Sequence, residues 1–229
     1  ENVKGLVTLS GGAFKDDIIS RFSKLGYYVS FKVLNAANYG VPQNRYRAFF
    51  VGMKNKGFVF PETLDFKVTT KDAIGDLPSL NGPEKIESYY CKPLTEFQKQ
   101  MRGEADILLN HEGTNHSQQT IDVISLIGDG GRIKDLPKEY WEIRKYNKAF
   151  ERMSSMGQSN TVDTGHRNYF HYSENRIPSV RENARLQSFP DCFEFLGSKT
   201  SQYKQVGNAV PVNLAYEIGL KIKEMLEGL

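Results

Sequence analysis

Residues 1–53 switch from the periodicity of a helix to that of strands, which restricts the chain to folds in which helices cover a sheet. One set of apolar residues recurs at the spacing of a helix face and predicts a helix ending at Gly26: Phe14, Ile18, Phe22 and Leu25. Residues 29–33 alternate between apolar and polar, which predicts a strand. The continuous apolar run at 48–51 is typical of a strand covered on both faces. The pattern therefore predicts a layered α/β fold.

The bulk composition is that of an ordinary globular protein. The chain has 229 residues, of which 39% are hydrophobic and 25% charged, enough for one domain or for a core with a smaller lobe. Its net charge of +3 permits a polyanionic partner without implying one. No apolar run approaches the length of a membrane span, so we expect no membrane partner, and two widely separated cysteines favour a cytoplasmic setting.

The cysteines and histidines lack the spacing of a metal site. Cys91 and Cys192 lie far apart in the chain, which indicates a reducing environment. The four histidines form two pairs five residues apart, so neither pair shares a helix face: His111 with His116, and His166 with His171. We therefore predict no metal site.

The middle of the chain is poor in regular patterns. From about Gly57 to Arg176, prolines, glycines and short polar stretches interrupt every periodicity. Two short helices are predicted within it, at 70–76 and 94–101, and residues 126–137 have the composition of a loop. This region is predicted to be a loop-rich lobe.

Regular structure resumes towards the C-terminus. Ser179 and Glu182 have the spacing of a capping box, which predicts a helix that runs to Gln187. A last helix is predicted from an apolar stripe made of Leu214, Ile218, Ile222 and Met225. The two ends of the chain, residues 1–56 and 176–229, are therefore predicted to form one α/β domain, which the loop-rich lobe, residues 57–175, interrupts.

Three strong hydrogen-bonding side chains alternate directly after a Gly-Val-Pro turn. Gln43, Arg45 and Arg47 lie two residues apart, and side chains at that spacing on an extended segment point the same way. Such a face suits the binding of an anion or of an oxygen-rich ring. An edge strand with solvated arginines explains the pattern equally well.

The stretch QVGNAVPV, residues 205–212, joins a helix cap to an apolar lip. Asn208 can cap the helix that follows, and Pro211 suits the first turn of that helix. The apolar lip at 209–212 resembles the wall of a site for a small ligand.

A group of arginines precedes this stretch. Arg176, Arg181 and Arg185 lie in a region with a mild excess of positive charge, which is compatible with phosphate contacts, and the last two share one face of the predicted helix. The alternative is that these arginines pair with nearby acids, Glu182 and Asp191 among them.

Read together, four motifs make the chain resemble the C-terminal portion of a cytosine-5 DNA methyltransferase of the bacterial restriction–modification type. They come in the order seen in that family: Glu1-Asn2-Val3, Gln43-Asn44-Arg45-Tyr46-Arg47, RIPSVRENARLQSFPD at 176–191 and QVGNAVPV at 205–212. The resemblance implies part of a Rossmann-like methyltransferase sheet, interrupted by a smaller, loop-rich target-recognition domain. It also implies S-adenosylmethionine as cofactor and double-stranded DNA as partner.

The same resemblance implies a role for each candidate residue. Glu1 would hydrogen-bond and protonate N3 of a flipped cytosine, Arg47 would hold its O2, and Arg45 would shape the loop or reach a phosphate. Two further sets are implied, one beside the cofactor and one on DNA. The first contains Asn208, Ala209 and Phe189, and the second Gln43, His166, Arg167, Arg176 and Arg181.

The chain departs from the family in what it lacks. The Pro-Cys nucleophile is absent, because Cys91 follows Tyr90 and Cys192 follows Asp191, and the glycine-rich cofactor motif is absent too. Since the chain does not begin with methionine, we expect a piece of a longer polypeptide or a subunit that needs an N-terminal half and is inactive alone. A DNA-binding module without chemistry and a folded remnant are the alternatives.

Overall fold

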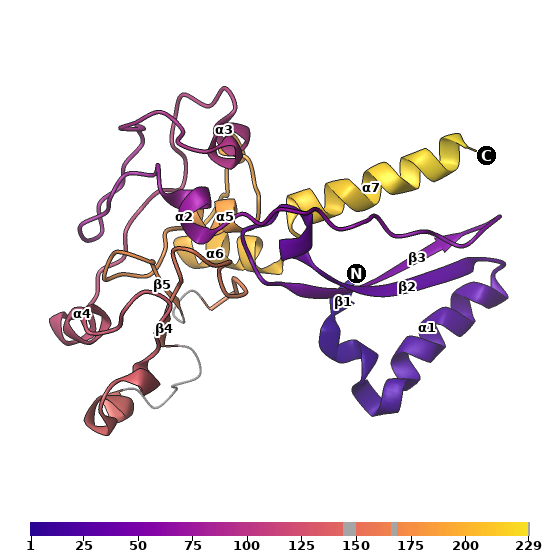
Figure 1. Ribbon diagram of the computed structural model, residues 1–229, viewed down its shortest axis with the longest axis horizontal. Helices are drawn as coiled ribbons and strands as arrows, with labels where there is room; N and C mark the ends of the chain where they lie inside the picture. The colour runs from indigo at the N-terminus through magenta and orange to yellow at the C-terminus, as the bar shows by residue number, and fades with distance from the viewer. Residues whose placement is uncertain (144–149, 166–168, 229) are drawn as a thin grey trace.

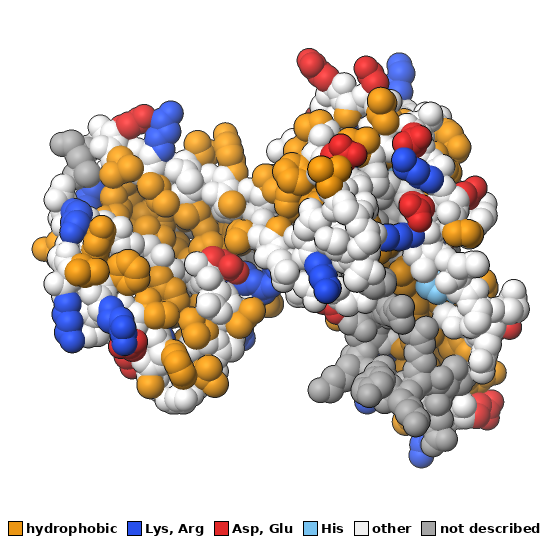
Figure 2. Space-filling model, turned by 180° about the vertical axis from the view of Figure 1, so that it is seen from behind, with side chains coloured by type: hydrophobic (Ala, Val, Ile, Leu, Met, Phe, Trp, Pro, Cys, Tyr) orange, Lys and Arg blue, Asp and Glu red, His pale blue; other side chains and the backbone are white. Residues whose placement is uncertain are grey.

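The computed structural model describes residues 1–143, 150–165 and 169–228 and divides into two lobes (Figure 1). The first, called here the sheet lobe, contains residues 1–60 and 211–228. The second, the loop-rich lobe, contains the described residues between 61 and 210. The two lobes meet at a narrow waist near the middle of the molecule (Figure 2).

The sheet lobe is built on three strands, whose order is β1-β3-β2. Their bounds are β1 Asn2–Val3, β2 Tyr28–Asn35 and β3 Tyr46–Met53. Both predicted strands are confirmed, and β3 is antiparallel to each of its neighbours. The expected Rossmann-like sheet is not visible among the described strands, because β2 returns to β3 through a short connection, whereas parallel neighbours need a long crossover.

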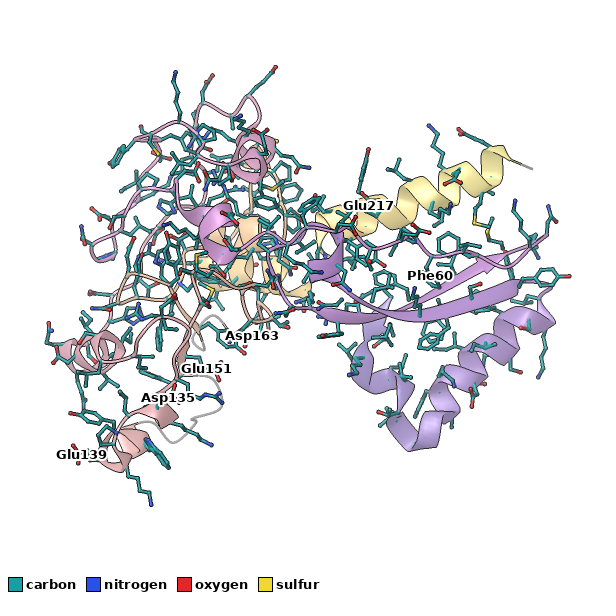
Figure 3. All side chains as sticks on the ribbon, in the orientation of Figure 1. Phe60, Asp135, Glu139, Glu151, Asp163 and Glu217 are labelled. Atoms are coloured by element: carbon teal, nitrogen blue, oxygen red, sulfur yellow. The ribbon has the colours of Figure 1, made fainter. Side chains whose placement is uncertain are left out.

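One face of this sheet carries the core of the lobe. Helix α7, Val212–Glu227, packs on it and buries Leu214 and Ile218 against Phe49 and other apolar side chains. Phe60 lies between α7 and the sheet (Figure 3). The predicted C-terminal helix and its apolar stripe are therefore confirmed.

The helix predicted to end at Gly26 is also present. It is α1, Ala13–Lys24, and Gly26 follows it with a left-handed φ of 79°. However, α1 has no buried residue: Phe14 and Phe22 are 49% and 48% exposed. The expectation that the run at 48–51 is covered on both faces holds only in part, since Phe50 is half-buried. Hydrophobic side chains accordingly gather over much of the sheet lobe in Figure 2.

Short elements make up the loop-rich lobe. They are α2 Thr70–Ile74, α3 Glu96–Arg102, α4 Gln118–Ser125, β4 Glu151–Arg152, β5 Tyr169–Phe170, α5 Val180–Leu186 and α6 Lys199–Asn208. The predictions of α2, α3 and α5 are confirmed, including the capping box from Ser179 to Glu182. Helices α4 and α6 were not predicted. Helix α6 is mostly polar, and tertiary packing of Tyr203 and Val206 compensates for its weak sequence signal.

The cores of the lobes divide the chain later than the sequence suggested. Val180 and Ala184 of α5 and Val206 of α6 pack with Ile74 and Met101 in one cluster of the loop-rich lobe. The segment 176–208 therefore packs with the loop-rich lobe and not with the sheet, and only α7 returns to β1–β3.

In the part of the chain that the structure describes, no helix is long and apolar enough to cross a membrane. The same residues contain no group of three or more potential metal ligands, so they offer no support for a metal centre.

Candidate functional site

Glu1 and Arg47 form an ion pair at the edge of the sheet. The antiparallel pairing of β1 and β3 sets Val3 opposite Arg47, which brings Glu1 within reach of it. Arg47 Nε lies 2.9 Å from Glu1 Oε1, and the two side chains are 15% and 26% exposed. Burial lowers the pKa of Arg47, and the Glu1 carboxylate opposes that shift. The structure thus brings two of the predicted catalytic residues together, at a place that a ligand can still reach.

Arg45 is buried at the waist between the lobes. Its guanidinium donates to the carbonyl oxygens of Val162 at 2.8 Å, Gly207 at 2.6 Å and Ala209 at 3.2 Å. Burial, together with the nearby charge of Arg47, lowers the pKa of Arg45 to about 10. Of the two predicted roles, the structure excludes contact with a phosphate, since Arg45 is 2% exposed, and agrees with shaping the loop.

Gln43 does not contribute to a wall shared with Arg47. Its amide donates to the Leu186 carbonyl oxygen at 3.0 Å, accepts from the Val162 N–H at 2.9 Å and has no exposed area. The prediction that Gln43 contacts DNA is therefore wrong. Strand β3 begins only at Tyr46, so Gln43 precedes the extended segment and forms a bridge with Ser159 instead.

Arg176 and Arg181 are buried in the loop-rich lobe. Arg176 donates twice to the Glu182 carboxylate, at 2.7 Å each, while Arg181 donates to the carbonyl oxygens of Leu109 at 2.8 Å and Phe193 at 2.6 Å. Both guanidinium groups are occupied away from solvent, so the prediction that they contact DNA is wrong. Pairing with nearby acids, the alternative, is confirmed for Arg176 with Glu182 and for Arg181, whose Nη1 lies 3.8 Å from Asp191 Oδ1.

The other predicted DNA-binding residues, His166 and Arg167, lie outside the described residues. The segment before them, 161–165, reaches the waist, where Thr161 Oγ1 donates to the Asn44 carbonyl oxygen at 2.7 Å. Asp163 follows on the side of the loop-rich lobe nearest the sheet (Figure 3).

The residues predicted beside the cofactor lie on two turns. Asn208 is exposed at the end of α6, and Ala209 follows it half-buried. Phe189 packs its ring near those of Phe193 and Phe195, with centroids 5.1 Å from each. The two turns meet where the Val212 N–H donates to the Gln187 carbonyl oxygen at 3.1 Å.

One local prediction about this stretch is wrong. Pro211 is the residue that precedes the first turn of α7, and α7 has no side-chain cap, so Asn208 does not cap that helix. Asn208 instead closes α6, a helix that the sequence did not reveal. Asn208 therefore remains at the surface, as binding of a small ligand requires.

A cavity of ≈ 400 Å³ also lies between the lobes, lined by residues that include Tyr39, Phe97, Asn213 and Glu217. Glu217 marks its α7 side (Figure 3). None of the residues predicted from the motifs lines this cavity. The sequence held no signal for it, because its walls come from four distant segments of the chain.

The fold and this site define an α/β chain with a carboxylate–guanidinium pair at a sheet edge beside a second, loop-rich lobe. The chain belongs to the C-5 cytosine-specific DNA methylase family, whose model matches residues 1–224. The resemblance inferred from the four motifs is thereby confirmed.

Curated relatives agree with this family. The chain is 40% identical over 227 residues to the Type II methyltransferase M1.HphI of Haemophilus parahaemolyticus, covering 98% of this chain and 56% of that protein. It is 32% identical over 261 residues to M.DdeI of Desulfomicrobium norvegicum, covering 100% and 63%. The chain therefore spans less than two thirds of the length of these two relatives.

A solved structure shares the fold. It is described as a DNA modification methyltransferase encoded within a prophage, from E. coli. The TM-score is 0.80 at 23% sequence identity, and the match covers 99% of this chain and 68% of that one. At this identity the likeness supports the fold alone.

Proposed function

We propose that this chain acts with an N-terminal half, in the same polypeptide or in a partner subunit, as a cytosine-5 DNA methyltransferase of a restriction–modification system. The Glu1–Arg47 ion pair carries the proposal, because it joins the first two family motifs at one accessible point. Two relatives that match 98% and 100% of this chain are named Type II methyltransferases, which supports the same reaction.

Glu1 and Arg47 are the residues of this chain that we assign to the target base. A cytosine flipped out of the duplex presents N3 and O2 on adjacent atoms of one edge. Arg47 donates to O2, and Glu1 hydrogen-bonds to N3 and, when its carboxyl group carries a proton, passes that proton to N3. The 2.9 Å contact between the two side chains orients both groups before the base arrives.

The cofactor proposed for this reaction is S-adenosylmethionine, which supplies the methyl group. The residues at 208–209 fit one wall of its site: Asn208 offers an exposed amide, and Ala209 adds a small apolar surface. Phe189 lies on the adjoining turn, where its partly buried ring can border the same site.

The loop-rich lobe is proposed to recognise double-stranded DNA. Its many connections place polar side chains on irregular loops, which suit the reading of base edges in the major groove. His166 and Arg167 remain the residues predicted to make such contacts, because their side chains can read base edges. They follow the segment that meets the waist at Thr161.

An N-terminal half would supply what this chain lacks, namely the cysteine nucleophile and the glycine-rich cofactor motif. Strand β1 is an exposed edge of the sheet, and α1 exposes apolar residues, Phe14 and Phe22 at 49% and 48%. Such an edge and face can accept further strands and helices of a larger Rossmann-like sheet.

Bisulfite sequencing of host DNA tests the proposal. The chain is expressed together with its native upstream coding region, as wild type, as Arg47→Ala and as the control Arg21→Ala, which removes only an exposed ion pair on α1. We expect methylated cytosines at one short motif in the wild type and in Arg21→Ala, and their loss in Arg47→Ala. Soluble wild-type protein that methylates no site would overturn the proposal and favour a DNA-binding module or a remnant.

A further inference from the structure

The waist contains a close packing of backbone that the roles above leave unexplained. Its members, called here the joint, are Gln43, Arg45, Val162, Gly207 and Ala209. They come from the segment that leads into β3, the strand that carries Arg47, from the segment leading to residue 165 and from the proposed cofactor wall. The regions proposed to bind the target base, the DNA and the cofactor therefore meet at this point.

Backbone pairing makes the first connection in the joint. The Asn44 N–H donates to the Ser159 carbonyl oxygen at 2.9 Å, and the Ser159 N–H donates to the Pro42 carbonyl oxygen at 2.9 Å. Gln43 adds a side-chain bond to the Val162 N–H. Residues 42–45 and 159–162 are therefore held in one register, only two residues before Arg47.

Arg45 makes the second connection. Its three acceptors are backbone carbonyl oxygens, one from Val162 and two from the wall at Gly207 and Ala209. Buried carbonyl groups need donors, and one planar guanidinium provides several in a fixed geometry. A single side chain thus connects segment 159–162 and the cofactor wall to the residues that lead into β3.

Gly207 makes the third connection by its lack of a side chain. A Cβ at this position would lie 2.5 Å from the carbonyl oxygen of Asp163 and 2.8 Å from the amide nitrogen of Thr164. Both neighbours are backbone atoms, so the clash could be relieved only by moving the segment or α6. The φ of Gly207 is not in the left-handed region, so backbone conformation does not require glycine here. The close approach of the neighbouring backbone does.

We propose that Gly207 and Arg45 are positioning residues, which hold Arg47 and the Asn208–Ala209 wall in register with segment 159–165 of the loop-rich lobe. This inference rests on the proposed function, because it concerns the rate of methyl transfer after DNA has bound. Displacing a reacting group by about 1 Å costs about 10²-fold in rate, so a small shift at the joint lowers turnover more than it lowers DNA affinity.

Gly207→Ala tests the joint, and Gly219→Ala is its matched control. Gly219 also lies within a helix, α7, but a Cβ there meets no atom within 4 Å. The variants are made in the chain expressed with its native upstream coding region. Turnover at saturating DNA and S-adenosylmethionine, the Kd for DNA and the folded fraction are measured for each.

We expect Gly207→Ala to lower kcat at least tenfold while its Kd for DNA stays within about threefold of wild type. Gly219→Ala should match the wild type in both. A kcat of Gly207→Ala within about twofold of wild type would overturn the inference. So would losses of kcat and DNA binding that both follow the folded fraction, since a purely structural role predicts that result.

A milder pair of variants tests the joint without introducing a backbone clash, in case Gly207→Ala does not fold. Thr161→Val removes the hydrogen bond to the Asn44 carbonyl oxygen at nearly constant volume, whereas Thr161→Ser keeps it. We expect a smaller fall in kcat for the valine variant and recovery with serine. Equal kcat values for the two variants would count against the joint.

Amide hydrogen exchange keeps the two proposals distinguishable. If the wild type does not methylate DNA, the proposed function fails, but exchange in Gly207→Ala still tests the connection. Faster exchange in both 159–165 and 43–47, with no change in Gly219→Ala, supports the joint. Faster exchange confined to 159–165 would overturn it.

Discussion

The two lobes satisfy their buried backbone in different ways. In the sheet lobe, β2 and β3 pair along eight positions each, and the core beneath α7 is apolar. In the loop-rich lobe, buried arginines take the place of strands: Arg152 donates to the carbonyl oxygens of Ile127, Ile124, His171 and Glu174. Where loops leave carbonyl groups without ladder partners, guanidinium groups supply the donors.

The lobes also differ in how completely they are covered. The sheet lobe has a well-packed face under α7 and an open one around α1, while the loop-rich lobe encloses ionic pairs such as Arg185 with Asp191. The stability of the loop-rich lobe should therefore depend on charge, and that of the sheet lobe on apolar volume. The single tryptophan, Trp141, lies in the loop-rich lobe and reports on that lobe by fluorescence.

The largest effect is expected for Arg185→Met. The Arg185 guanidinium binds Asp76 and lies 2.6 Å from Asp191 Oδ2, and all three side chains are fully buried. Removing the guanidinium leaves the buried carboxylates of Asp76 and Asp191 without this positive partner, which should lower the free energy of unfolding by about 3–5 kcal/mol. Urea denaturation followed by Trp141 fluorescence measures the change. Arg21→Met, at an exposed pair, should leave the free energy of unfolding almost unchanged, and equal losses in the two variants would contradict the comparison.

Leu214→Ala should have the next largest effect. Leu214 is fully buried between α7 and the sheet, so its truncation should cost about 3 kcal/mol. Circular dichroism should report the loss more strongly than Trp141 fluorescence, because the cavity forms in the sheet lobe. Leu220→Ala, on the same helix but 45% exposed, is the control. An equal shift of both signals would show that the lobes unfold as one unit.

Acidification should weaken the loop-rich lobe. Burial lowers the pKa of His111 and of His171 from 6.5, despite the opposing charge of Glu182. Below that value the unfolded chain binds protons that the folded chain excludes, so the free energy of unfolding falls as pH drops through 6.5. Trp141 fluorescence in urea from about pH 7.5 to about pH 5.5 measures this. A stability that is flat over that range would disagree with burial as the cause.

Phe22→Ser should have the smallest effect on stability. Phe22 is 48% exposed on α1, so we expect a change of about 0.5 kcal/mol or less. Removing apolar surface should instead weaken self-association of the isolated chain, which sedimentation velocity measures. A loss of stability close to that of Leu214→Ala would mean that the open face contributes to the core.

Sequence patterns predicted the elements whose signals are local. The predicted helices α2, α3 and α5 begin at capping boxes, at Thr69, Thr95 and Ser179, and the alternation at 29–33 became β2. Helix α6 was not predicted, because its apolar residues are few and its stability comes from tertiary packing. The family motifs likewise identified Glu1 and Arg47, which the fold brings into contact.

The sequence by itself thus determined the family, the main helices and strands, and the residues of the ion pair. Only the tertiary structure decided which arginines stay at the surface. Arg45 and Arg47 are equivalent in a strand pattern, yet one is buried and the other is not. The two arginines differ in burial because buried carbonyl groups of Val162 and Gly207, more than a hundred residues away in the chain, need the hydrogen-bond donors of Arg45. A requirement of that kind is set by the folded chain and leaves no local mark in the sequence.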